Sequence, residues 1–318
     1  MDYRILNTIG SKYSVEAKEI INQLGSVDYL DLDQEKLEEI ISGYNIVVVG
    51  LGLNINKKVI DKAVNLKLIA TATTGLDHID TGYAKEKNIA VLSLRGETEF
   101  LNTITGTAEL AFGLAIDLLR KTPFAFNSVM NNEWNREKFR GHNVYGKTLG
   151  IVGLGRLGCW MARYGKAFGM RVIATDPNID NDIFVKEGCA KVSFDELLAQ
   201  SDIVSLHVHL STETEGMFNK DVFSKMRQGS YLINTSRGKI VDQGDLIEVL
   251  ERGAVAGYAT DVLSDELEYD GGLKDQPLVE YAKSHNNVII VPHIGGMTYE
   301  SREATDIFIA QKVLDFFR

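Results

Sequence analysis

A buried strand that runs directly into a glycine-rich loop is the feature that most constrains the fold of this chain. Residues 148–152 form a short, mainly apolar segment typical of a strand. Residues 153–158 follow the pattern G-x-G-x-x-G, and a helical pattern covers residues 157–168. In such a loop Gly153 would allow a tight turn, Gly155 would let the backbone approach a pyrophosphate, and Gly158 would let helix and strand pack closely. Phosphates then face the free N–H groups at the helix N-terminus. The strand, loop and helix together predict a dinucleotide site, against the alternative of a glycine turn in a non-binding α/β protein.

An acidic residue follows the next predicted strand. Residues 171–174 form that strand, and Asp176 stands 18 residues beyond Gly158. A carboxylate there can bind both ribose hydroxyls of NAD and would repel the 2′-phosphate of NADP. Residues 177–180 contain no lysine or arginine that could hold this phosphate. The sequence therefore predicts NAD as the cofactor.

Short β-branched segments alternate with amphipathic ones along the whole chain. The strands predicted are residues 3–6, 27–30, 46–49, 66–71, 89–92, 148–152, 171–174, 203–207, 231–234, 254–258 and 287–291. The helices predicted are residues 15–24, 34–41, 57–63, 103–120, 157–168, 194–200, 243–252 and 299–317. Residues 124–146 are polar and aromatic, and we interpret them as an excursion outside the core. This order predicts α/β architecture with doubly wound parallel sheets.

Composition excludes several classes of protein. The length of 318 residues suggests two domains, and the net charge of -10 argues against binding nucleic acid or a membrane surface. Cys159 and Cys189 are the only cysteines and have no metal-ligand spacing, so no metal is expected and a reducing compartment is favoured. Residues 1–10 show no signal-peptide pattern. The apolar stretch 104–119 contains two acidic residues and is predicted to be a core helix. Together these features predict a cytoplasmic location.

Three later positions carry groups suited to reducing a 2-keto acid. Arg237 follows a predicted strand end, Glu266 lies in a loop with other acidic residues, and His293 stands between a proline and glycines. The reaction needs a cation for the carboxylate and a proton donor for the carbonyl oxygen. An arginine, and a histidine that a carboxylate keeps charged, meet these needs. Taken singly, each has a simpler reading: a surface ion pair, a solvated loop charge and a turn residue.

Taken together, the ordered motifs resemble the D-isomer-specific 2-hydroxyacid dehydrogenase family, which includes glycerate, D-lactate and phosphoglycerate dehydrogenases. The resemblance covers nearly the whole chain. The motifs that carry it are residues 74–80, 108–110, 146–150, 153–158, 205–207, 234–238, 261–266 and 292–296. The resemblance implies NAD-dependent hydride transfer between NADH and the C2 carbonyl of a small 2-keto acid.

The resemblance also implies a role for each matching residue. Arg237 would bind the substrate, His293 would be the acid/base, and Glu266 would hydrogen-bond the histidine. The backbone N–H groups of Thr74 and Gly75 would hold the substrate carboxylate. The cofactor contacts implied are Thr107, Gly153, Gly155, Arg156, Leu157, Gly158, Asp176, His207, Thr235, Asp261, His293 and Gly295. Among these, Arg156 and Leu157 would act through their backbones, and Asp261 would hold the nicotinamide amide.

The domain organisation implied by the resemblance is discontinuous. A flavodoxin-like substrate domain would comprise residues 1–100 and 293–318, with a Rossmann NAD-binding domain, residues 101–292, inserted into it. A homodimer formed through the NAD-binding domain is expected, with residues 124–146 as the contacting arm. Two departures from the family pattern stand out. His207-Val208-His209-Leu210 lacks the usual proline, and Leu267 replaces the proline that usually follows the glutamate.

Alternatives to this function remain open at this stage. Phosphoglycerate and phosphite enzymes share the three catalytic residue types, whereas formate enzymes carry glutamine in place of Glu266. A corepressor of the same fold binds NAD(H) as a sensor. Residues 49–56 contain no arginine, and Lys57 and Lys58 are the only nearby cations. This favours a small unphosphorylated substrate such as glyoxylate, hydroxypyruvate or pyruvate over a phosphorylated one.

Overall fold

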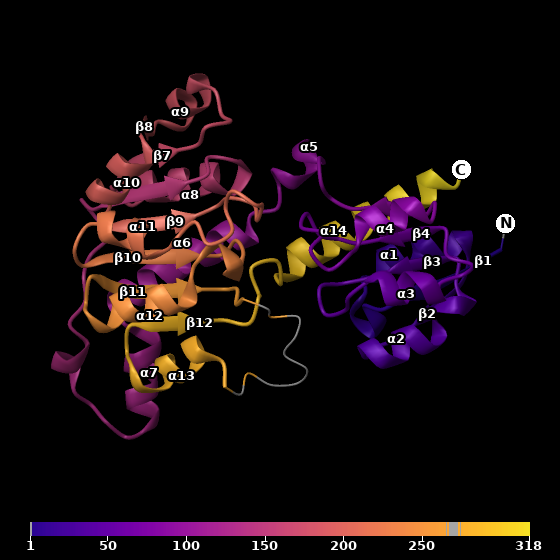
Figure 1. Cartoon of the computed structure of the whole chain (residues 1–318), viewed down its shortest axis with the longest axis horizontal. Helices are drawn as coiled ribbons and strands as arrows, with labels where there is room; N and C mark the ends of the chain where they lie inside the picture. The colour runs from indigo at the N-terminus through magenta and orange to yellow at the C-terminus, as the bar shows by residue number, and fades with distance from the viewer. Residues whose placement is uncertain (1, 265, 267–272, 274) are drawn as a thin grey trace. The chain divides into compact units, whose positions relative to one another are not determined.

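The chain folds into two compact units in the computed structural model, which describes residues 2–264, 266, 273 and 275–318. Unit 1 comprises Met1–Thr103 and Met297–Arg318, and unit 2 comprises Ile104–Gly296 (Figure 1). The sequence-based prediction places these two boundaries after residues 100 and 292. Each unit is an α/β domain built on one parallel sheet.

Unit 1 contains a five-stranded parallel sheet in the order β2-β1-β3-β4-β5. This is the flavodoxin-like order, as predicted. The central strands β3 and β4 are buried at every position, which is why they appear in the sequence as continuous apolar runs. The strands are β1 (Tyr3–Asn7), β2 (Gly25–Tyr29), β3 (Ile46–Val48), β4 (Leu68–Ala70) and β5 (Ala90–Leu92).

Helices cover this sheet, and most of them begin at a residue whose side chain caps the first turn. Ser14, Asp33, Asn56, Asp80 and Thr298 each accept a hydrogen bond from a backbone N–H group of the helix that follows. The C-terminal helix α14 packs against α1 and returns the chain to unit 1 (Figure 1). The helices are α1 (Val15–Ile21), α2 (Gln34–Ile40), α3 (Lys57–Lys62), α4 (Thr81–Glu86), α5 (Thr98–Leu101) and α14 (Tyr299–Phe316).

Unit 2 contains a seven-stranded parallel sheet in the order β12-β11-β10-β9-β6-β7-β8. Counted from β6, this is the Rossmann order with one strand added beyond the sixth, so the predicted fold class is confirmed. The strands are β6 (Thr148–Val152), β7 (Arg171–Thr175), β8 (Ala190–Lys191), β9 (Ile203–Leu206), β10 (Ser230–Asn234), β11 (Val255–Thr260) and β12 (Val288–Ile290).

Hydrophobic clusters form the core on both sides of this sheet. One cluster includes buried residues of α6 and α8, and the other includes those of α10 to α13. The helices are α6 (Gly106–Arg120), α7 (Thr122–Met130), α8 (Arg156–Ala167), α9 (Asn181–Glu187), α10 (Phe194–Gln200), α11 (Lys220–Lys225), α12 (Gln243–Glu251) and α13 (Pro277–Ser284). In the described part of the chain, no helix combines the length and the apolar character needed to cross a bilayer.

The segment 124–146 includes most of a helix that the sequence analysis did not predict, α7 (Thr122–Met130). Helix α7 begins with Pro123 in its first turn and buries none of its residues. A short 3₁₀ turn, Arg136–Phe139, follows it. The helix is only partly buried on one side, to which Phe124 contributes, so the apolar period that identified the other helices is weak here.

Candidate active site

The glycine loop between β6 and α8 has the close contacts that its three glycines predict. Gly153 has φ +94°, and a Cβ atom there would lie 2.7 Å from the carbonyl oxygen of His207. A Cβ on Gly158 would lie 2.1 Å from the Gly153 carbonyl oxygen, whereas one on Gly155 would meet nothing within 4 Å. No side chain caps α8 at Gly155, and its first turn has no acidic residue. The N–H groups of this turn are therefore suited to bind phosphate.

Asp176 is held beside the glycine loop by two backbone hydrogen bonds. Its Oδ2 accepts from the N–H of Leu154 and its Oδ1 from the N–H of Asn178, both at 2.9 Å. A carboxylate oxygen has more than one lone pair, so both oxygens can still accept ribose hydroxyls. The structure therefore places Asp176 where a Rossmann site requires an acidic residue.

Two buried polar atoms at neighbouring strand ends have no hydrogen-bond partner among the described residues. They are Nδ1 of His207, after β9, and Oγ1 of Thr235, after β10. The other ring nitrogen of His207 lies 2.9 Å from Oγ of Ser205, and burial lowers the His207 pKa to about 4. Unpartnered buried polar atoms are uncommon in proteins, and a polar ligand would satisfy both. These residues therefore fit a dinucleotide.

Arg156 turns its side chain away from the glycine loop toward the start of α6. Its guanidinium donates to the carbonyl oxygen of Ile104, and burial lowers its pKa. Thr107, in the first turn of α6, lies beside Gly295, since a Cβ on Gly295 would be 3.1 Å from the Thr107 methyl group. Both arrangements are compatible with the contacts expected from sequence, in which Arg156 contributes its backbone.

The predicted catalytic residues follow three neighbouring strands of the sheet in unit 2. Arg237 follows β10, Glu266 follows β11 and His293 follows β12. Because β10 pairs with β11 and β11 pairs with β12, all parallel, the three loops emerge at the same edge of the sheet. Ligands of open α/β sheets bind at this carboxyl edge.

His293 and Glu266 form a close pair. Nδ1 of His293 lies 2.6 Å from Oε1 of Glu266, and each side chain is 27% exposed. The other oxygen of Glu266 accepts from the backbone N–H of Leu263 at 3.2 Å. The carboxylate assigns the proton of the neutral ring to Nδ1, which leaves Nε2 for a substrate.

Asp261 fixes the backbone on which His293 stands. Its Oδ1 accepts from the N–H of Ile294 at 2.6 Å, its Oδ2 from the N–H of Gly295 at 2.7 Å, and its carbonyl from the N–H of His293 at 3.0 Å. His293 itself has φ +52°, a left-handed conformation that is rare outside glycine. Burial raises the pKa of Asp261, and the two N–H groups partly offset this. A Cβ on Gly295 would lie 2.9 Å from Oδ2 of Asp261, so the turn requires glycine.

Asn234 and Ser236 hold the backbone around Arg237. The sequence analysis did not single them out individually, although both belong to the motif over residues 234–238. The side-chain amide of Asn234 donates to the Arg237 carbonyl at 2.9 Å, and its oxygen accepts from the N–H of Ser236 at 3.0 Å. A Cβ on Gly238 would lie 2.1 Å from the carbonyl carbon of Leu263. The Arg237 loop thus packs against the backbone that leads to Glu266.

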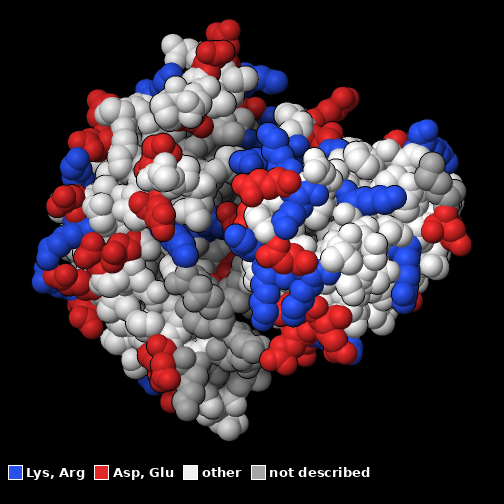
Figure 2. All heavy atoms as spheres, turned by 45° about the vertical axis from the view of Figure 1, so that its right-hand side comes forward, with Lys and Arg blue, Asp and Glu red and all other residues white. Residues whose placement is uncertain are grey.

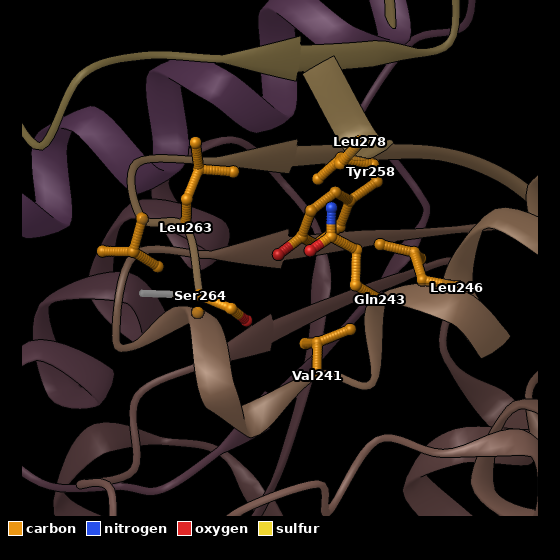
Figure 3. A pocket seen from close by; sticks show the side chains of 9 residues that line it. Val241, Gln243, Leu246, Tyr258, Leu263, Ser264 and Leu278 are labelled. Atoms are coloured by element: carbon orange, nitrogen blue, oxygen red, sulfur yellow. The ribbon is translucent and has the colours of Figure 1, made fainter. Parts of the chain in front are cut away.

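A small pocket lies behind these two loops. Figure 3 shows the side chains of Val241, Gln243, Leu246 and Tyr258 around it, with Leu263 and Ser264 on the adjoining segment. Its lining is mainly apolar, and it includes Gly238. The pocket therefore belongs to the packing that supports the Arg237 and Glu266 loops.

The remaining predicted residues, Thr74 and Gly75, lie in unit 1 in the loop after β4. In unit 2 the structure gathers the other candidates at the carboxyl edge of one sheet. Among the described residues, no group of three or more His, Cys, Asp or Glu side chains is placed to hold a metal ion.

Comparison with known proteins identifies similar families and structures. Residues 112–295 match the family described as "D-isomer specific 2-hydroxyacid dehydrogenase, NAD binding domain". The chain is 35% identical to D-3-phosphoglycerate dehydrogenase of Bacillus subtilis over 292 residues, which cover 91% of this chain and 53% of the relative. It is 36% identical to the enzyme of the same name from Archaeoglobus fulgidus over 284 residues, covering 89% and 51%. The chain thus spans about half the length of these curated relatives.

Solved structures match over nearly the full length. D-lactate dehydrogenase from Aquifex aeolicus, complexed with NAD and lactic acid, has a TM-score of 0.85 and 31% identity, and the match covers 99% of this chain and 95% of that one. A glyoxylate reductase from a Paecilomyces species has a TM-score of 0.80 and 27% identity, with 98% and 94% covered.

Proposed function

Because this chain belongs to the D-isomer-specific 2-hydroxyacid dehydrogenase family, we propose that it catalyses the reversible NAD-dependent reduction of a small 2-keto acid to the D-2-hydroxy acid. The observation that carries the proposal is the pairing of His293 with Glu266 at 2.6 Å, on the same sheet edge as Arg237. This is the set of groups that reduction of a carbonyl beside a carboxylate needs.

NAD is the cofactor of unit 2, as the family match over residues 112–295 and the NAD complex of the Aquifex relative indicate. The N–H groups of Arg156 and Leu157 would hold the pyrophosphate, and Asp176 would bind the ribose hydroxyls. His207 and Thr235, whose buried polar atoms lack partners among the described residues, would complete the site. When bound, NADH supplies the hydride.

His293 would give a proton to the carbonyl oxygen during reduction and take it back during oxidation. Its Nδ1 is engaged by Glu266, so Nε2 is the atom that would carry the exchanged proton. Glu266 would therefore hold the His293 ring in one orientation, with Nε2 available to the substrate.

Arg237 would bind the substrate carboxylate and orient the carbonyl. A guanidinium can make two parallel hydrogen bonds to a carboxylate, which fixes the direction of the bound acid as well as neutralising its charge. The backbone N–H groups of Thr74 and Gly75, contributed by unit 1, would bind the same carboxylate.

The substrate we propose is small and unphosphorylated, of the glyoxylate, hydroxypyruvate or pyruvate type, rather than phosphoglycerate or phosphite. The three lysines of α3 already have partners. Lys58 lies 2.7 Å from Glu38, and Lys62 is 3.0 Å from the same carboxylate. Lys57 lies over the ring of Tyr83 at 4.7 Å. Recruiting these lysines to a phosphate would break interactions that the protein already makes.

A second copy of this chain is the protein partner we propose, bound through unit 2. Helix α7 and the segment after it expose large apolar side chains, including Phe126, Met130 and Trp134, the last 90% exposed. Apolar side chains gathered on one projecting segment are typical of an interaction surface.

On the face shown in Figure 2, Lys and Arg side chains are interspersed with Asp and Glu, an arrangement unlike a nucleic-acid-binding surface. Both cysteines are free thiols, which supports the cytoplasmic location we propose.

The experiment that tests the proposed function is a rate measurement with NADH and a panel of 2-keto acids. We expect turnover with at least one of pyruvate, glyoxylate and hydroxypyruvate, and weaker turnover with the keto acid of 3-phosphoglycerate. Arg237→Ala should lower kcat/KM by about 100-fold or more, since a charge-assisted contact in a dry site contributes about 3 kcal/mol. Arg237→Lys should also be impaired because lysine lacks the planar fork.

The controls separate catalysis from folding. Arg252→Ala removes a surface arginine that pairs with Glu248 in α12, and it should leave kcat/KM unchanged. Glu266→Gln should lose less activity than His293→Ala, because glutamine keeps a hydrogen-bond acceptor. NADH binding without turnover of any acid would favour a sensor of the corepressor kind. A wild-type rate for Arg237→Ala would remove Arg237 from the mechanism.

A further inference from the structure

Three side chains form a hydrogen-bonded chain beneath the loop that carries Thr74 and Gly75. Nε2 of His78 lies 3.3 Å from Oγ1 of Thr71, and this oxygen lies 3.1 Å from Oγ1 of Thr73. The Thr73 hydroxyl donates to the carbonyl oxygen of Gly75 at 2.7 Å. Thr71 is fully buried and His78 is 2% exposed, so water does not compete for this end of the chain.

The chemistry of the last member sets the direction of every hydrogen in this chain. A carbonyl oxygen can only accept, so the single hydroxyl hydrogen of Thr73 points to Gly75. Thr73 can then only accept from Thr71, which must donate its own hydrogen. Thr71 in turn can only accept from His78. The network therefore assigns a proton to Nε2 of His78.

Backbone hydrogen bonds hold both ends of this loop. The N–H of Thr71 donates to Leu92 at 2.9 Å, and the N–H of Leu94 donates to the carbonyl of Thr73 at 3.0 Å. At the far end, the N–H of Ile55 donates to the carbonyl of His78 at 2.7 Å. Between these anchors, the bond from Thr73 to the Gly75 carbonyl closes the turn that contains Thr74. The bond from Leu94 holds the peptide that carries the Thr74 N–H. The Thr73 hydroxyl holds the Gly75 carbonyl and so constrains the preceding peptide, which carries the Gly75 N–H.

We propose that Thr73 is a positioning residue for the substrate carboxylate, with its hydroxyl oriented by Thr71 and His78. The proposal rests on the proposed function, in which the N–H groups of Thr74 and Gly75 bind that carboxylate. Thr73 does not touch the substrate. It acts by keeping the Gly75 N–H in the direction that the carboxylate needs, so loss of its hydroxyl weakens acid binding and leaves the chemistry of His293 in unit 2 intact.

The test compares Thr73→Val, which keeps the side-chain shape but removes the hydroxyl, with Thr73→Ser, which keeps the hydroxyl. Thr73→Val should raise KM for the 2-keto acid about tenfold, equal to about 1.4 kcal/mol, with kcat and the Kd for NADH changed by less than about twofold. Thr73→Ser should restore the wild-type KM. Thr71→Val should raise KM less, because the Thr73 hydroxyl can still reach the Gly75 carbonyl.

Thr8→Val is the matched control. Thr8 stands just after β1 at the same carboxyl edge, and its hydroxyl donates to the carbonyl of Val48 at 3.1 Å. Its loss removes the same kind of bond from unit 1 without touching the Thr74 loop, so KM should not change. Equal KM values for Thr73→Val and Thr8→Val would overturn the proposal, as would a Thr73→Ser variant as impaired as Thr73→Val.

A second measurement does not depend on activity. The ¹⁵N NMR signals of the His78 ring, identified by their loss in His78→Gln, should show the proton on Nε2. A proton on Nδ1 alone would overturn the direction of the chain. If the wild-type protein reduces no 2-keto acid, the proposed function fails and the Thr73 role fails with it. An Nε2 proton together with active wild type and a normal KM in Thr73→Val would refute the positioning role alone.

Discussion

Asp306 is a buried carboxyl whose replacement should stabilise unit 1 at neutral pH. It lies on α14 against α1, is 1% exposed, and has a pKa raised by burial from 3.8 to about 6. Arg302, 3.4 Å away, and the N–H of Ser14 only partly offset the burial. The folded state therefore holds its proton more tightly than the unfolded chain does. Stability from this group is full below pH 3.8 and is lost as pH rises through about 6.

The size of the effect follows from the two pKa values. A difference of this size at about 1.4 kcal/mol per pKa unit corresponds to about 3 kcal/mol at most. An asparagine at this position would keep an oxygen that accepts from Ser14 but would carry no charge. The substitution also deprives Arg302 of its ionic partner, which reduces the gain. We expect Asp306→Asn to raise the free energy of unfolding by about 1 to 3 kcal/mol at pH 8 and by much less at pH 4.5.

Hydrogen exchange of α1 and α14, followed by mass spectrometry across pH in the wild type and Asp306→Asn, measures this local stability directly. The gain in the variant should grow between pH 4.5 and 6.5 and level off above pH 7. Asp315→Asn, an exposed aspartate on the same helix, is the control and should show no such dependence. A difference between variant and wild type that is the same at pH 4.5 and pH 8 would refute the assignment of the raised pKa to Asp306.

Three further outcomes are expected in unit 2. Asp176 beside the glycine loop should give a strong preference for NADH over NADPH, and comparable kcat/KM for the two cofactors would contradict its role. Gly238→Ala places a Cβ 2.1 Å from the Leu263 backbone, so it should destabilise the protein by about 1 to 3 kcal/mol in urea unfolding and lower kcat/KM. Unchanged values would show that the loops carrying Arg237 and Glu266 can move apart. Burial holds the pKa of His207 at about 4, so the ratio of NADH Kd values for His207→Gln and wild type should be constant between pH 5.5 and 8, and a step near pH 6.5 would show that His207 titrates there.

The strands and helices that were predicted accurately are those with a clear local pattern, such as a buried strand or a capped helix start. The strand β6 was predicted to the residue because all five positions are buried and most of them are apolar. Helix α10 was also predicted to the residue, and the structure shows a reciprocal capping box of Ser193 and Glu196 at its start. The two-residue strand β8 is exposed and was not predicted, and short helices such as α4 have too few turns to show a period.

The geometry around His293 could not be predicted from the sequence. The pairing of His293 with Glu266 was expected from a family resemblance, and its 2.6 Å contact joins residues 27 positions apart. Asp261 was expected to hold the nicotinamide amide, and the structure adds a contact from each of its oxygens to the backbone after His293. That arrangement depends on φ +52° at His293, and a histidine in a sequence gives no sign of a left-handed conformation.

The reaction class and the substrate depend on different kinds of structure. Reaction class follows from groups at the ends of β10, β11 and β12, where strand pairing sets where Arg237, Glu266 and His293 emerge. We propose that substrate choice depends on unit 1, where the ion pair of Lys58 with Glu38 engages a cation that a phosphate would need. On this proposal, the chain shares its reaction type with D-3-phosphoglycerate dehydrogenase, to which it is 35% identical over 292 residues, and takes a different acid.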